Sequence, residues 1–149
     1  MLLINENDIY VYFEIIKQNS AKRVLDVGMF LSRIKAVSRQ VENLSINENV
    51  ILDGVNITSE EIFPVYQKIY DSIITNYDWG NDYDLIIFLR ANEFLDPGQR
   101  LKVWEQIKQT KAAVLSDTID PAFTQFLINN YDAGEIKLGN NSYILAGRL

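Results

Sequence analysis

The residue types best suited to chemistry gather in one stretch, Lys22 to Val37. An apolar run from Arg23 to Val27 predicts a short buried strand that carries Asp26, and Gly28 predicts a sharp turn directly after it. From Ser32 onward the apolar spacing predicts a helix. A strand, a glycine turn and a helix place a helix N-terminus over a bound ligand, so the stretch favours a nucleotide-type site.

The composition excludes several other kinds of chemistry. The chain has no Cys and no His, so thiol nucleophiles, disulfides, imidazole bases and Cys/His zinc sites are impossible, and we expect no metal centre. The net charge is −6 and the basic residues are scattered, which argues against nucleic acid as a partner. No apolar run approaches the ~18 residues of a membrane span. Because the first residues also do not resemble a signal peptide, we expect a cytoplasmic protein.

The pattern of elements predicts one α/β domain over residues 1–149. Apolar runs alternate with amphipathic segments, which implies a mostly parallel central sheet with helices on both faces. Gly139-Asn140-Asn141 predicts a C-terminal antiparallel hairpin. The expected strands are 23–27, 49–53, 72–76, 84–89, 112–115, 135–138 and 142–146, and the expected helices are 8–18, 32–44, about 60 or 64 to 70, 98–109 and 121–130.

Three segments of this order resemble the class I S-adenosylmethionine-dependent methyltransferases. Val24-Leu25-Asp26-Val27-Gly28 is similar to the first motif of that family, and Asp53 stands where the family keeps an acid after the second strand. Tyr83 to Ile87, followed by Asn92 to Pro97, is similar to the fourth strand and its loop. The resemblance covers nearly the whole chain and implies the Rossmann-like methyltransferase sandwich.

The resemblance also implies roles for single residues. Asp26 and the Gly28 turn would face the methionine part of S-adenosylmethionine, and Asp53 would accept hydrogen bonds from its ribose. Asp78, or Tyr77 beside it, would lie near the adenine. Leu89, Arg90 and Ala91 would line the mouth where the methyl group is transferred. Arg90 is also the candidate substrate contact, because pockets in open α/β sheets lie beyond the carboxyl ends of the strands.

The chain departs from the family at the loop after the first strand. The family continues with two further glycines, where this chain has Phe30 and Ser32. The second glycine normally lets the backbone approach the ligand closely. Phe30 therefore either lines the wall of the cofactor pocket or fills a vacated site and packs near Leu89. Phe94 stands where the fourth-strand loop of the family often has a histidine.

Simpler interpretations stay open for each candidate. Asp26 could hydrogen-bond the amides of its own turn, Asp53 could cap the Gly54 turn, and Arg90 could be an ordinary surface residue. A phosphoacceptor receiver domain is disfavoured because the acids are wrongly placed, and a dinucleotide oxidoreductase because GxGxxG is absent.

Two functions remain. The first is methyl transfer from S-adenosylmethionine to an unknown acceptor, achieved by positioning the donor against a nucleophile. The second is a degenerate, non-catalytic relative that serves as a partner or scaffold. The binding partner is then a small molecule or another protein chain.

Overall fold

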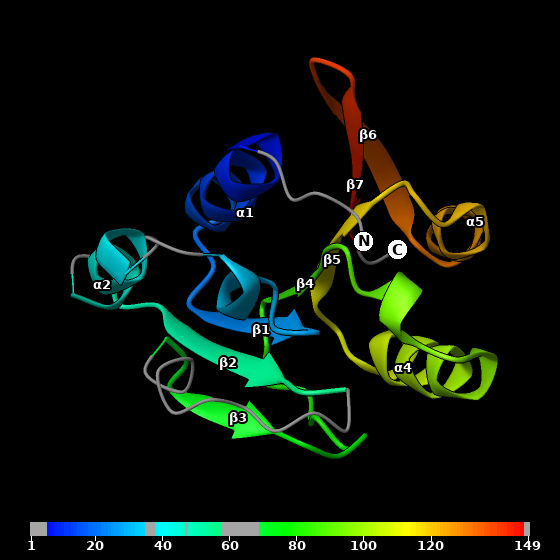
Figure 1. The fold of residues 1–149 in the computed structure, drawn as a ribbon, viewed down its shortest axis with the longest axis horizontal. Coiled ribbons are helices and arrows are strands. Elements are labelled where there is room, and N and C mark those ends of the chain that lie inside the picture. Colours follow the sequence, from blue (N-terminus) through cyan, green and yellow to red (C-terminus); the bar gives the residue numbers. More distant parts are fainter. Residues whose placement is uncertain (1–5, 35–37, 47, 58–68, 148–149) are drawn as a thin grey trace.

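A seven-stranded sheet forms the centre of the molecule. The computed structural model describes residues 6–34, 38–46, 48–57 and 69–147. The strand order is β3-β2-β1-β4-β5-β7-β6, with β1 to β5 parallel and the final two strands antiparallel (Figure 1). The strands are β1 Arg23–Val27, β2 Ile51–Val55, β3 Ser72–Ile74, β4 Leu85–Phe88, β5 Ala113–Asp117, β6 Asp132–Leu138 and β7 Asn141–Gly147.

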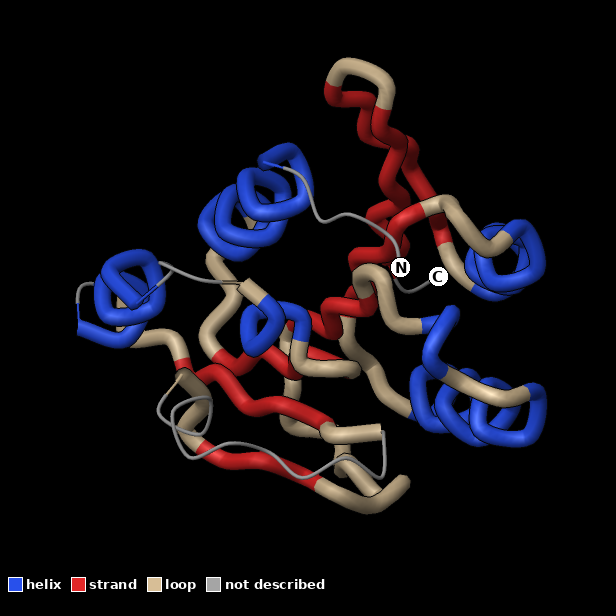
Figure 2. Tube along the Cα trace, viewed as in Figure 1, coloured by secondary structure: helices blue, strands red, loops and turns tan. Residues whose placement is uncertain are grey.

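Helices cover both faces of the sheet (Figures 1 and 2). One face carries α1 (Glu6–Gln18), the 3-10 helix η1 (Phe30–Arg33) and α2 (Ser38–Ile46). The other face carries α4 (Pro97–Gln109) and α5 (Pro121–Asn130), and a short 3-10 helix η2 (Asn92–Phe94) precedes α4. The predicted α/β class, the central parallel sheet and the C-terminal hairpin are confirmed.

Strand β4 holds the middle of the sheet because it is apolar on both sides. All four of its residues are buried, and it pairs with β1 and β5. Leu85 and Ile87 contribute to the core under α1, while Ile86 and Phe88 contribute to the core under α4 and α5. A continuous apolar run is what a parallel strand covered on both faces requires.

Two predicted boundaries are wrong. The helix expected from Ser32 begins later, at Ser38, because Phe30–Arg33 form a 3-10 turn and Ile34 is extended. The strand expected at 49–53 is shifted to Ile51–Val55. Gly54 continues this strand rather than breaking it, because it pairs with both neighbouring strands. A Cβ at Gly54 would lie 2.9 Å from the Met29 side chain, so glycine makes room there for the loop after β1.

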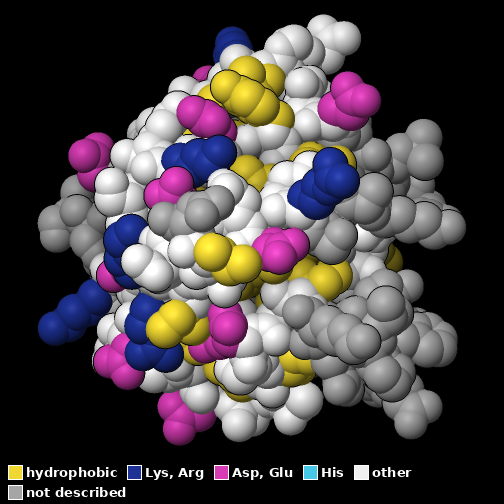
Figure 3. Space-filling model, turned by 90° about the vertical axis from the view of Figure 1, so that its left-hand side faces the viewer, with side chains coloured by type: hydrophobic (Ala, Val, Ile, Leu, Met, Phe, Trp, Pro, Cys, Tyr) yellow, Lys and Arg dark blue, Asp and Glu magenta, His cyan; other side chains and the backbone are white. Residues whose placement is uncertain are grey.

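Leu101 of α4 is 63% exposed. The helix expected between about residue 60 and residue 70 lies largely outside the described residues. Along the described segments, no helix has the length and apolarity needed to cross a membrane. On the face shown in Figure 3, basic and acidic side chains are intermingled.

Candidate functional site

The Asp26 carboxylate at the end of β1 is surrounded by donors from its own chain. Its Oδ1 accepts the Phe30 N–H at 2.9 Å, and its Oδ2 lies 3.4 Å from the Leu31 nitrogen. The hydroxyls of Tyr12 and Tyr70 donate to Oδ2 at 2.9 and 2.7 Å. Asp26 has no exposed surface, and this burial raises its pKa although all four hydrogen bonds favour the charged form.

Gly28 makes the tight turn that the sequence predicted. Its φ is 92°, a conformation that glycine adopts without strain. Its N–H donates to the Val55 carbonyl at 2.9 Å. A Cβ at this position would lie 2.7 Å from the Ala91 Cβ. The loop after β1 therefore packs directly on the loop after β4, and only glycine fits between them.

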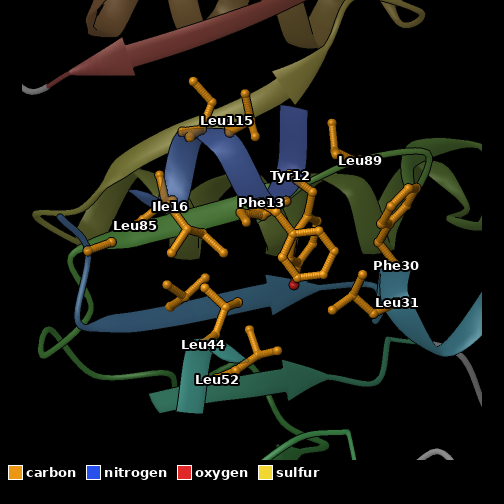
Figure 4. Packing of buried hydrophobic residues seen from close by; sticks show 14 of the residues in the cluster. Tyr12, Phe13, Ile16, Phe30, Leu31, Leu44, Leu52, Leu85, Leu89 and Leu115 are labelled. Carbon is orange, nitrogen blue, oxygen red and sulfur yellow. The ribbon is translucent and has the colours of Figure 1, made fainter. Parts of the chain in front are cut away.

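The Phe30 ring is part of the core. It has no exposed surface and stacks on Tyr12 of α1, with ring centroids 5.6 Å apart and an interplanar angle of 18° (Figure 4). Leu89, also without exposed surface, belongs to the same apolar cluster. In this arrangement the ring is buried and belongs to the apolar cluster that also contains Leu89.

Arg33 ties the loop after β1 to the end of β4. Its Nη1 donates to the Arg90 carbonyl at 2.8 Å and its Nη2 to the Leu89 carbonyl at 3.0 Å. The guanidinium lies 5.7 Å from the centre of the Phe30 ring and 5.1 Å from that of Phe94. Burial lowers the pKa of Arg33, and the nearby Asp26 carboxylate opposes this effect.

Arg90 is a buried ion-pair partner and not a surface residue. Its Nε and Nη2 donate to the Asp8 carboxylate of α1, each at 3.2 Å, and Asp8 also accepts the Tyr143 hydroxyl at 2.5 Å. The Arg90 backbone has a φ of 55°, and its N–H donates to Asp117 at 2.6 Å. The guanidinium predicted to contact substrate is thus engaged by Asp8 of α1, and Tyr143 of β7 donates to the same carboxylate.

Asp8 and Tyr12 lie one turn apart on α1 and hold two of the predicted site residues. Asp8 binds Arg90 at the end of β4, and Tyr12 binds Asp26 at the end of β1. Residues four apart lie on the same face of a helix. One face of α1 therefore spans the carboxyl ends of the two central strands.

Asp53 lies away from this edge. It sits in the middle of β2, where its carboxylate accepts the Tyr83 hydroxyl at 2.7 Å and lies 3.9 Å from the Arg23 guanidinium. Arg23 begins β1 and Tyr83 precedes β4, so both partners belong to the amino-terminal ends of the strands. Asp53 thus has structural partners in this geometry and lies within β2 rather than after it.

Asp78 lies in the loop after β3. Its side chain is exposed, and its N–H donates to the Asn76 Oδ1 at 2.9 Å. Neighbouring Tyr77 has the Lys102 ammonium 5.5 Å from its ring centre. The loop is at the carboxyl edge, as an adenine contact requires, but the described contacts of Asp78 are those of a turn residue.

A cavity of about 270 Å³ opens beside the loop after β4. Its walls come from the ends of β4 and β5 and from the starts of η2, α4 and α5. The lining residues are Arg90, Ala91, Asn92, Glu93, Arg100, Asp117, Ile119, Asp120 and Pro121. Among the described residues, no group of three or more acids is placed to hold a metal ion.

Several functional partners were not found by sequence reasoning. The hydrogen-bond partners of Arg90 and Asp26 include Asp8, Tyr12 and Tyr70. Nothing in the sequence distinguishes these three residues from other members of amphipathic segments. The one available signal for Asp8 and Tyr12 is their spacing of four residues on the face that carries the apolar stripe of α1.

Solved structures share this architecture over nearly the whole chain. The methyltransferase domain of bacterial CtHen1 aligns over 95% of this chain and 97% of that chain, with a TM-score of 0.64 and 11% identity. The chain has the class I methyltransferase fold. Magnesium protoporphyrin IX methyltransferase from Synechocystis PCC 6803, solved with bound S-adenosylmethionine, aligns over 96% of this chain and 77% of that chain, with a TM-score of 0.58 and 15% identity.

A methyltransferase from Geobacter sulfurreducens aligns over 99% of this chain and 81% of that chain, with a TM-score of 0.61 and 8% identity. No protein-family model and no curated protein matches the sequence. The methyltransferase fold is therefore carried by a sequence that has diverged far from these structures.

Proposed function

We propose that this methyltransferase-fold chain does not use S-adenosylmethionine and instead works as a binding or scaffold subunit for another protein chain. One observation supports the proposal: the chain's own groups surround Asp26, the residue that the resemblance assigns to the methionine part of the cofactor. Asp26 accepts donors from Tyr12, Tyr70, Phe30 and Leu31. The Phe30 ring lies beside it without exposed surface.

The residues at the predicted cofactor contacts do not fit a bound cofactor. A side chain that lines an open pocket keeps some accessible surface, whereas Asp26, Phe30 and Leu89 keep none. A carboxylate that orients a ligand amine must also be within reach of the ligand. Oδ2 of Asp26 accepts two tyrosine hydroxyls and Oδ1 accepts the Phe30 N–H. The acceptor capacity that Oδ1 keeps has no exposed surface in this arrangement.

The predicted mouth of the site is also engaged. Leu89 and Arg90 are two of the residues expected to line this mouth, and their carbonyl oxygens both accept hydrogen bonds from Arg33. The Arg90 side chain is paired with Asp8. The groups that would meet a donor and an acceptor are thus used within the chain.

Methyl transfer from S-adenosylmethionine remains the second candidate function. The cavity of about 270 Å³ beside Arg90 and Asp117 favours it, because small-molecule sites in open α/β sheets lie at this edge. Catalysis would then consist of holding an acceptor nucleophile against the methyl group. This function requires Phe30 and Arg33 to leave their present positions.

Calorimetric titration separates the two functions. The chain is titrated with S-adenosylmethionine and with S-adenosylhomocysteine, and a methyltransferase that binds both serves as the control. We expect no saturable heat from either compound up to millimolar concentration. Saturable binding of either compound at micromolar affinity would overturn the proposal and establish the cofactor-dependent alternative.

A further inference from the structure

Strand β6 leaves one complete edge of the sheet without a partner in the described part of the chain. All seven of its residues pair with β7 on one side, and β6 is the last strand in the sheet order. Figure 1 shows the β6–β7 hairpin projecting past the helices. The opposite edge of the sheet, β3, has only three residues. A long edge offers its backbone N–H and C=O groups to another strand.

The charged side chains on this edge are complementary to those of a second copy of the same strand. Glu135 and Lys137 are on the same face of β6, with side chains 50% and 76% exposed and a charged N···O distance of 4.0 Å. Ile136 between them lies on the other face and packs against the core. A lone lysine on an edge discourages pairing. An acid two residues before it supplies the opposite charge that a second copy of the same strand needs.

Symmetry limits how two copies of β6 can pair. A sheet that continues across two copies has its two-fold axis perpendicular to the sheet, so a residue of β6 must lie opposite itself. Centring on Glu135 or on Lys137 places like charges opposite each other, which is unfavourable. Centring on Ile136 places Glu135 of each copy opposite Lys137 of the other copy, which gives two pairs of opposite charge. The charge pattern therefore selects one register.

We infer that β6 binds β6 of a second copy of this chain, antiparallel and centred on Ile136. This pairing joins two seven-stranded sheets into one and protects the backbone edge of both copies. The inference is independent of the cofactor question, because β6 is four strands away from β1 in the sheet.

Charge reversal tests this interface by sedimentation equilibrium. The wild type should be dimeric, and Glu135→Lys or Lys137→Glu alone should weaken the dimer about tenfold, because each replaces two attractive pairs with two repulsive ones. The double variant should restore the wild-type affinity. Lys102→Glu on α4, which is also exposed, is the matched control. A wild type that stays monomeric, or a dimer unaffected by either reversal, would overturn the inference.

Cysteine cross-linking tests the register. The chain has no native Cys, so a single introduced thiol reports one position. In this register Ile136→Cys faces itself, with Cβ atoms about 4.5–5.5 Å apart, and should oxidise to a covalent dimer. Lys137→Cys is more exposed but faces Glu135 of the second copy, and should cross-link much less. Faster cross-linking of Lys137→Cys than of Ile136→Cys would rule out this register.

Discussion

Asp26 shows how a motif residue can keep its place while its partners change. The resemblance implies that this carboxylate contacts a ligand. In the structure it accepts hydrogen bonds from two tyrosine hydroxyls and from the turn that follows β1. The simpler interpretation of Asp26, a hydrogen-bond acceptor for its own turn amides, describes these contacts. The tyrosine hydroxyls extend it to α1 and to the segment before β3.

The raised pKa of Asp26 has a consequence for stability. Burial raises the pKa of Asp26 in the folded chain above its value of about 3.9 in the unfolded chain. Between these values the folded state holds a proton that the unfolded state has released. The free energy of unfolding should therefore fall as pH rises through this window.

Asp26→Asn should remove the fall in unfolding free energy with rising pH, because an amide does not titrate. The measurement is urea unfolding at a series of pH values from acid to neutral, with Asp78→Asn, whose side chain is exposed, as the control. Parallel pH profiles for the wild type and Asp26→Asn would contradict the burial argument.

Phe30 should behave as a core residue. Because its ring is fully buried and stacked on Tyr12, Phe30→Ala should lower the free energy of unfolding by about 3–5 kcal/mol. Tyr10→Ala, on an exposed ring of α1, is the control and should cost much less. Denaturant unfolding measures both. A loss below about 1 kcal/mol for Phe30→Ala would mean that the ring does not fill the site.

At the scale of elements, α1 is the part that closes the carboxyl edge. It buries Val11, Ile15 and Ile16 in the core and uses Asp8 and Tyr12 to hold the ends of β4 and β1. This helix thus supplies partners to the two residues, Arg90 and Asp26, that the resemblance assigns to ligand contacts.

Asp8→Ala should be strongly destabilising, because it leaves the Arg90 guanidinium buried without its counter-ion. Breaking a buried ion pair from one side typically costs about 3–5 kcal/mol. Glu6→Gln, an exposed change in the first turn of the same helix, should cost under about 1 kcal/mol. Thermal and urea unfolding measure the loss of stability in each variant. Equal losses of unfolding free energy would contradict the role of Asp8 in holding the end of β4.

The strands differ in how well the sequence predicts them. The bounds of β1 are as predicted, and β4 lies within its predicted range. β4 is a continuous apolar run buried on each side, and β1 is mainly apolar and buried from Val24 onward. β2 is displaced by two residues because Gly54 pairs within the strand, where the rule for glycine predicts a break. The helix expected from Ser32 begins only at Ser38. Residues 30–33 instead form a 3-10 turn, and Arg33 in it donates to the carbonyls of Leu89 and Arg90, contacts that local periodicity does not reveal.

At the scale of the whole molecule, the alternation of strands and helices carries the fold. It is sufficient to predict the parallel sheet and the terminal hairpin, since these depend on pattern and connection rules. The site depends instead on pairs distant in sequence, such as Asp8 with Arg90 and Tyr70 with Asp26. No local pattern encodes such partners, so the contacts of the candidate site residues could not be predicted from the sequence.

We propose that the chain's own side chains occupy the place of the cofactor. Chemical shifts of the amides beside Asp26 test this proposal directly. The Phe30 and Leu31 N–H groups, which point at the Asp26 carboxylate, are followed in ¹⁵N-correlated spectra while S-adenosylmethionine is added to millimolar concentration. The account predicts that both signals keep their positions. Saturable shifts of these two amides at micromolar cofactor would contradict it.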